Sequence, residues 1–226
     1  DMQSPEGFYT IVPGLMNPNS SYFLAFNTGF PNKFDKANGR RGSYLMVHGD
    51  CKSVGCYAMT DASMAEIYAL ARESFRGGNT AFQVQIFPFR MTADNMAKQT
   101  TNPHFDFWKN IKQGYDYFEA TKSPPAWDVC ERRYIFNPQS TTPLDPMGYC
   151  PPTIQNAALS AHQQADDARF SAAMAADQRK LDEAAAIRAR GQAINGAVSG
   201  FWGNITGAQT PAPVAQPPAL PATTQS

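Results

Sequence analysis

One histidine and one cysteine within residues 46–59 have the types and spacing needed for nucleophilic chemistry. His48 ends a short apolar run, and Cys56 follows after a loop, with Gly55 immediately before it. A thiol is a strong nucleophile only as the thiolate, which a nearby imidazole and a helix N-terminus both favour. The loop of residues 49–55 is long enough to fold back and bring the two side chains together. We therefore predict that Cys56, just before a helix, is a nucleophile and that His48 is its base.

Other histidines and cysteines leave alternatives open. His104, downstream of Cys56, permits a papain-like arrangement, although its place at a helix start also fits a capping or surface role. Cys51 can pair with Cys130 or Cys150, pack as a structural thiol, or act as a resolving thiol for an oxidised nucleophile. The nucleophile itself has a structural alternative, because free cysteines are commonly buried. The loop supplies at most three metal ligands, so we predict no metal and no cofactor.

The segment His48-Gly49, followed by Ser53-Val54-Gly55-Cys56, resembles the signature of the L,D-transpeptidase (YkuD-type) family, His-Gly … Ser/Thr-His-Gly-Cys-x-Arg. Residues 4–9 are similar to the Thr-Pro-x-Gly strand of that family. The run from residue 4 to about 136 resembles the YafK-like branch. The segments that carry this wider resemblance are residues 17–20, 48–61, 87–92 and 134–136.

The resemblance implies acyl transfer on peptidoglycan stem peptides. Cys56 would attack the carbonyl of a diaminopimelate residue, release D-alanine and pass the acyl group to an amine. His48 would take the thiol proton, with the backbone carbonyl of Gly49 orienting its ring. Ser53 would brace the loop, and Gly55 would allow close backbone approach at the oxyanion. The residues expected to bind substrate are Lys52, Tyr57 and Arg90.

Three departures from the signature bear on the acyl acceptor. Val54 replaces the second histidine, Ala58 replaces the arginine, and the loop is shorter than in typical members. The cations that can replace the arginine are Lys52, Arg40, Arg41 and Arg90. If water replaces the amine, the same thioester chemistry becomes hydrolysis, which would release a lipoprotein or a crosslink from the wall. A third possibility is an inactive wall-binding module.

Strand and helix patterns interleave in the part of the chain that carries these residues. Strands are predicted at residues 8–12, 22–26, 42–47, 82–86 and 130–136. Helices are predicted from the apolar stripes of residues 64–75 and 105–118, the first with Thr60 or Asp61 as its cap and Gly77-Gly78 as its end. This order predicts a mixed α+β fold with a mainly antiparallel sheet and packed helices.

The two ends of the sequence differ in composition. Residues 1–139 are predicted to form the L,D-transpeptidase-like catalytic domain, truncated at its N-terminus. Residues 140–153 are predicted to be a linker, and residues 154–195 an Ala-rich helix in which His162 is solvated. Residues 196–226 are predicted to be an uncharged Pro/Ala tail without fixed structure.

Charge and hydropathy exclude several classes of protein. The 226 residues include 19 basic and 19 acidic side chains, so the formal net charge is zero. This balance argues against a nucleic-acid-binding arm. No apolar run approaches the roughly 18 residues that a membrane helix needs. The expected partners are diaminopimelate-containing stem peptides and an envelope lipoprotein, in a bacterial periplasm or cell envelope, with a signal peptide upstream. Cell-wall organisation and cell shape are the processes that this implies.

Overall fold

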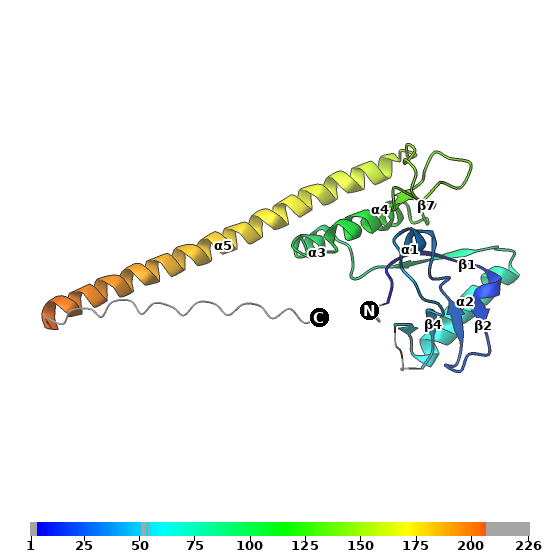
Figure 1. Cartoon of the computed structure of the whole chain (residues 1–226), viewed down its shortest axis with the longest axis horizontal. Helices are drawn as coiled ribbons and strands as arrows, with labels where there is room; N and C mark the ends of the chain where they lie inside the picture. The colour runs from blue at the N-terminus through cyan, green and yellow to red at the C-terminus, as the bar shows by residue number, and fades with distance from the viewer. Residues whose placement is uncertain (1–3, 51–52, 54, 207–226) are drawn as a thin grey trace. The chain divides into compact units, whose positions relative to one another are not determined.

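The computed structural model describes residues 4–50, 53 and 55–206, without the side chains of residues 203–206. Predictions for Cys51, Lys52 and Val54 lie outside the described residues. The chain divides into two units, Asp1–Ala173 and Met174–Ser226. Figure 1 shows the elements, which are β1 (Gly7–Ile11), the 3₁₀ turn η1 (Pro13–Leu15), β2 (Met16–Asn17), β3 (Ala25–Asn27), α1 (Lys33–Ala37), β4 (Met46–His48), β5 (Tyr57–Ala58), α2 (Asp61–Arg76), β6 (Phe82–Ile86), α3 (Ala93–Ala97), α4 (Phe105–Thr121), β7 (Trp127–Cys130), β8 (Arg133–Phe136) and α5 (Ala157–Thr206).

β1 lies between two hydrophobic cores of the first unit. Successive strand side chains point to opposite faces, so Phe8 packs with residues of α4 and β8, whereas Tyr9 and Ile11 pack with residues of β3, β4 and α2. β1 pairs antiparallel with β6, with Ile11 opposite Phe82. Burial of both faces fixes this strand firmly, and the segment that precedes it is thereby held near the candidate site.

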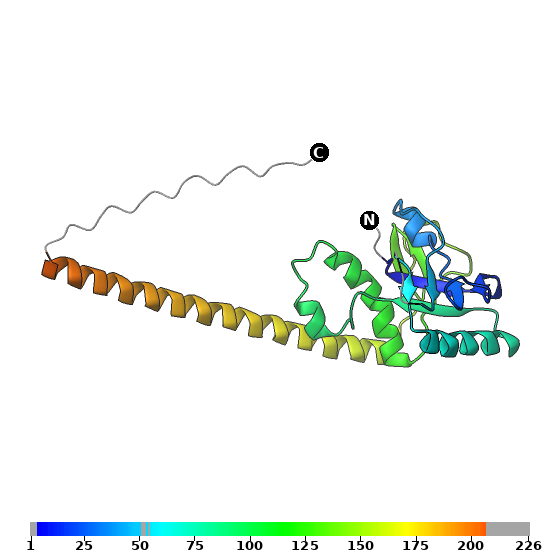
Figure 2. The same cartoon turned by 90° about the horizontal axis from the view of Figure 1, so that it is seen from below.

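A four-stranded sheet in the order β2-β3-β4-β5 carries that site. β2, β3 and β4 are antiparallel, and β5 runs parallel to β4. α2 packs against β3 and β4, and Figure 2 shows it running along one side of these strands. The α+β class with mainly antiparallel pairing is confirmed.

α2 and α4 form where the apolar stripes predict them. The Thr60 hydroxyl accepts a hydrogen bond from the Ser63 amide at 3.2 Å, and Gly77 follows the last helical residue. In α4, Gly114 faces the rings of Phe8 and Phe136 so closely that a Cβ there would overlap both rings. A glycine at this position therefore allows α4 to approach β1 and β8.

The region predicted as one strand, residues 130–136, is instead the hairpin β7–β8. Glu131 and Arg132 both have positive φ, 48° and 59°. Two consecutive positive φ angles characterise the type I′ turn, which matches the twist of a hairpin. Asn110 of α4 clamps β8, because its side chain donates to the Tyr134 carbonyl at 2.8 Å and accepts from the Tyr134 amide at 2.9 Å.

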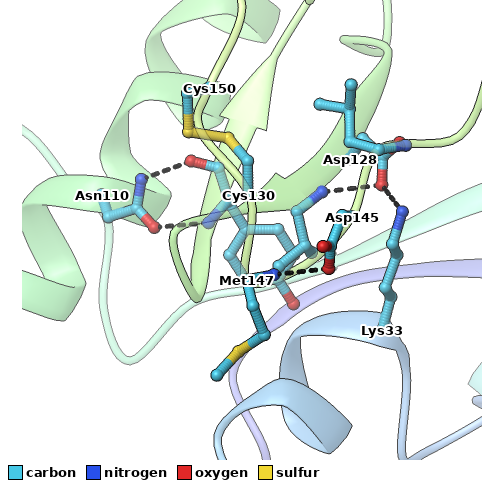
Figure 3. Close-up of a disulfide and its surroundings, with 10 residues drawn as sticks. Lys33, Asn110, Asp128, Cys130, Asp145, Met147 and Cys150 are labelled. Atoms are coloured by element: carbon cyan, nitrogen blue, oxygen red, sulfur yellow. Dashed lines mark hydrogen bonds and ion pairs between the residues drawn. A yellow bond between two sulfur atoms is a disulfide. The ribbon is translucent and has the colours of Figure 1, made fainter.

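Residues 140–153, predicted as a linker, are fastened to this hairpin. Cys130 and Cys150 form a disulfide, which Figure 3 shows beside the clamp from α4. The Asp128 carboxylate accepts from the Leu144 amide at 2.8 Å and from Lys33 Nζ at 2.5 Å. Burial raises the pKa of Asp128, but the hydrogen bonds from the Leu144 amide and Lys33 together lower it by more, so the pKa lies below its usual value.

The first turns of α5 pack on α4. Lys112 lies 2.6 Å from both Asp116 and Asp166, and His162 Nε2 lies 3.5 Å from Asp116. His162 is therefore partly buried in a charged cluster and differs from its predicted solvated position. Phe170 completes the contact by packing against the first core.

α5 begins at Ala157 and ends at Thr206, whereas the predicted helix spans residues 154–195. Gly191, Gly196 and Gly200 cost about 1 kcal/mol each in a helix, but the surrounding alanines favour continuation. Within the described part of the chain, no helix combines the length and apolarity required to span a bilayer.

Candidate functional site

His48 stands at the end of β4 with its imidazole oriented by the backbone. The side chain is 3% exposed, and Nδ1 lies 2.5 Å from the carbonyl oxygen of Gly49. A carbonyl oxygen only accepts hydrogen bonds, so Nδ1 carries the proton and Nε2 keeps its lone pair. The ring of Tyr22 covers the imidazole at a centroid distance of 5.0 Å. In this tautomer Nε2 is able to take a proton.

The carbonyl that orients the imidazole is itself held from several sides. The Gly49 amide donates to the Leu24 carbonyl at 3.1 Å. A Cβ at Gly49 would lie 2.6 Å from Asp61 Oδ1 and 3.0 Å from the Cβ of Phe23. Asp61 also accepts from the Asp50 amide at 2.8 Å, which closes the turn over the start of α2. A side chain at this position would therefore displace the carbonyl.

Cys56 is a half-buried free thiol on a braced loop. Its Sγ lies 3.6 Å from the Tyr44 carbonyl oxygen and donates to it. The Ser53 hydroxyl donates to the carbonyl of Cys56 at 2.7 Å, and the Ser4 hydroxyl donates to the carbonyl of Gly55 at 3.0 Å. Gly55 has a φ of +87°, which favours glycine. Because the peptide is trans, the Cys56 amide points away from Ser4 and is the candidate oxyanion donor.

α2 does not directly follow the cysteine along the chain, in contrast to the prediction. β5 follows Cys56, and α2 begins only at Asp61. The parallel pairing of Val47 with Tyr57 explains this, because it fixes residues 57–58 as a strand beside β4. The thiol is thus placed by the sheet and not by a helix.

Cys56 and His48 line one pocket of about 300 Å³. Its other walls come from the end of β2 and the loop after it, and from the start of β4 and the segment before it. They are formed by Asn17, Ser20, Ser21, Tyr22, Tyr44 and Met46. The pocket thus brings a thiol and an imidazole together between two tyrosine side chains.

The predicted substrate-binding residues lie in different places. The Tyr57 hydroxyl donates to the Pro5 carbonyl, and burial followed by the charge of Glu6 raises the pKa of Tyr57. Tyr57 thus fastens the N-terminal segment to β5. Arg90 is exposed beside α4, where its charge acts on Tyr115.

Sequence reasoning missed the aromatic walls of the pocket. Tyr22 and Tyr44 were included in predicted strands, but neither belongs to a strand in the structure. Tyr44 has a φ of 59° and is 73% exposed. Their spacing carries no signal, because their meeting with His48 and Cys56 depends on how the loops fold.

His104, the other candidate base, lies elsewhere. It immediately precedes α4 and makes no capping hydrogen bond with its side chain, and its ring is tilted against that of Trp108 at a centroid distance of 6.2 Å. It lines a different cavity from the one that Cys56 lines. Among the residues that the structure describes, no three His, Cys, Asp or Glu side chains gather in a way that could hold a metal.

Two curated proteins are similar in sequence to the chain. Two proteins named "Putative L,D-transpeptidase YafK", from Escherichia coli strain K12 and Escherichia coli O157:H7, are each 47% identical to the chain over 135 residues. The match covers 60% of this chain and 55% of each relative, so the chain spans about half the length of the curated relatives it matches. No protein-family model matches it. The identity over these 135 residues supports placing the chain in the YafK-like L,D-transpeptidase family.

Proposed function

We propose that the chain is a cysteine acyltransferase that acts on peptidoglycan stem peptides through a Cys56 thioester. The observation that carries this proposal is the shared pocket of Cys56 and His48, in which the Gly49 carbonyl sets the tautomer of the imidazole. The relationship to proteins named as L,D-transpeptidases supports the substrate class. Gly55 and Ser53 contribute by shaping the loop that holds Cys56, and Tyr57 contributes by fastening the N-terminal segment to β5.

In the first half-reaction the thiol proton passes to His48 Nε2. The Cys56 sulfur attacks the carbonyl carbon of diaminopimelate, and the Cys56 amide stabilises the resulting oxyanion. The tetrahedral intermediate collapses to a thioester as the carbon–nitrogen bond to D-alanine breaks. The departing nitrogen takes the proton from the imidazolium, which returns His48 to its starting state.

In the second half-reaction an amine attacks the thioester. His48 Nε2 removes a proton from the amine, and the thiolate leaves and recovers a proton from the imidazolium. The product is a new amide, and the enzyme is regenerated. Water at the same position would give a carboxylic acid instead, so the acceptor decides between transfer and hydrolysis.

The disulfide between Cys130 and Cys150 supports an envelope location. Such bonds form and persist in oxidising compartments such as the bacterial periplasm. Peptidoglycan is found in the same compartment. We therefore propose that the chain works in the periplasm on diaminopimelate-containing stems, including stems that carry a lipoprotein.

The test uses the full chain, reduced at Cys56, with lipoprotein-bearing sacculi and with Cys56→Ala as its matched control. Muropeptides are read by mass spectrometry. We expect diaminopimelate crosslinks that form only with the wild-type chain. Release of lipoprotein or of crosslinked stems by the wild-type chain alone would show that water is the acceptor. Identical products from both chains would refute thioester chemistry.

The identity of the base is tested by trapping the acyl-enzyme and weighing the intact protein. We expect His48→Ala to abolish the mass increase on Cys56. His162→Gln, a control far along the chain in α5, should retain it. An acyl-enzyme that survives His48→Ala but is lost with His104→Ala would contradict the assignment and favour the papain-like arrangement.

A further inference from the structure

A second cavity, of about 320 Å³, is formed between the N-terminal segment, the loop after α1 and the start of α4. It is distinct from the pocket of Cys56 and His48, and the catalytic steps above do not use it. Its charged and polar lining includes Glu6, Arg40, Arg41 and His104. Its volume lies at the lower end of the range of small-molecule sites.

Two hydrogen bonds join one wall of this cavity to the catalytic loop. Ser4 lines the cavity and donates to the carbonyl of Gly55, the residue before the nucleophile. Pro5 also lines it and accepts from the hydroxyl of Tyr57, the residue after the nucleophile. The peptide segment that forms this wall is therefore in direct contact with both neighbours of Cys56.

A second part of the lining is also close to the nucleophile along the chain. Arg41 lines the cavity, and Tyr44, three residues further along the same loop, accepts the thiol hydrogen bond of Cys56. Three residues span at most about 10 Å. Ser4, Pro5 and the loop of Arg41 and Tyr44 thus connect the lining of the cavity to the residues around Cys56.

One charged residue of the cavity, Arg40, is already paired, whereas Arg41 and Glu6 are able to bind a ligand. Arg40 is held in place, because its Nη1 lies 3.2 Å from the fully buried carboxylate of Asp35 and its guanidinium stacks over Phe34 and Phe107. Within the described residues, Arg41 and Glu6 have no ion-pair partner. Glu6 uses Oε2 to accept from Trp108 Nε1 at 2.7 Å, which orients the carboxylate and leaves Oε1 for a ligand.

We propose that this cavity binds the zwitterionic end of the diaminopimelate side chain whose own carbonyl Cys56 attacks. Arg41 binds the carboxylate, Glu6 binds the ammonium group, and the proposal rests on the proposed function. A ligand with a carboxylate alone would meet the negative charge of Glu6, and one with an ammonium alone would meet the positive charge of Arg41. Only a group that carries both charges satisfies both residues.

Calorimetric titration of the full chain carrying Cys56→Ala tests this without turnover. The probes are a tetrapeptide that contains meso-diaminopimelate and the same tetrapeptide with lysine in its place. The two differ by one carboxylate. A charge-assisted hydrogen bond predicts about tenfold weaker binding of the lysine peptide. Adding Arg41→Gln should lower the affinity for the diaminopimelate peptide to that for the lysine peptide and so remove the difference between them.

Two further variants make the result specific. Glu6→Gln should lower the affinity for both peptides by the same factor, since both keep the ammonium group. The Gln side chain can still accept the hydrogen bond from the Trp108 indole, so this variant changes only the charge. Arg76→Gln, an exposed arginine at the end of α2, should leave both affinities unchanged. Equal binding of the two peptides, or a difference that persists with Arg41→Gln, would overturn the proposal. Titration does not depend on the thiol, so this failure is separate from a failure of the sacculus assay.

Discussion

Removing the Cys130–Cys150 disulfide isolates the contribution of one closed loop to stability. Cys130 is fully buried and Cys150 is exposed, so Cys150→Ser places the new hydroxyl in solvent. The remaining thiol of Cys130 is a small, weakly polar group that a core accepts readily. The folded segment should stay in place, because Glu131 and Arg132 still donate to the carbonyls of Gly148 and Pro146.

The expected loss follows from the length of the loop. The two cysteines are separated by 20 residues in sequence. Closing a loop of this size removes about 11 cal/mol/K of entropy from the unfolded chain, which is about 3 kcal/mol at 25 °C. A domain with a total stability of about 5–15 kcal/mol would lose a substantial share of it.

Urea unfolding followed by tryptophan fluorescence measures this loss, with Trp127, in the same strand as Cys130, as a reporter. Cys56→Ser is the matched control, since it replaces a cysteine that closes no loop and should change the free energy of unfolding by less than about 0.5 kcal/mol. Opening the bond in the wild-type chain with reductant should match Cys150→Ser. A loss below about 1 kcal/mol, or the same loss in the control, would refute the loop-closure reasoning.

Three further predictions concern the site and the cores. Gly49→Ala should lower turnover in the sacculus assay by about a hundredfold, since its Cβ displaces the carbonyl that orients the imidazole; unchanged turnover would contradict the role of that carbonyl. Gly114→Ala should destabilise the first unit by about 1–3 kcal/mol in urea, because overlap with two buried rings outweighs helix propensity, whereas Gly191→Ala, with open space around it, should increase helix content by circular dichroism. Burial raises the pKa of Asp116 above 3.8, so between the unfolded and folded pKa values the folded protein holds a proton that the unfolded chain releases. This contribution to stability therefore falls as pH rises through the folded pKa. Asp116→Asn should flatten that slope in urea midpoints measured between about pH 4 and 7, and an unchanged slope would contradict the reasoning.

Features that depend on local sequence were predictable. The apolar stripe from Met64 to Phe75, with Thr60 before it and Gly77 after it, is enough to predict where α2 begins and ends. β6 spans residues 82–86 in the structure as well as in the prediction. In these segments the propensity, the periodicity and the caps all agree, so tertiary contacts had nothing to overrule.

Features that depend on distant partners were not predictable. Glu131 and Arg132 make a turn without glycine or asparagine, so the hairpin carries no turn signal and was taken for one strand. The strand between Cys56 and α2 exists only because β4 lies beside it. The walls of the pocket come from Tyr22 and Tyr44, which loop folding brings together. The catalytic pair could thus be proposed from spacing, but the surroundings that select a substrate could not.

The chain carries two kinds of sulfur that require opposite treatment. The buried half of the bond at Cys130 resists reduction, whereas the half-exposed thiol of Cys56 is open to sulfenic acid formation and to mixed disulfides. Any surroundings oxidising enough to close the bond also threaten the thiol of Cys56. If Cys56 is the nucleophile as proposed, activity will then depend on a mild reductant as well as on substrate. Purification must respect the same window, with enough reductant to keep Cys56 as a thiol and too little to open the bond.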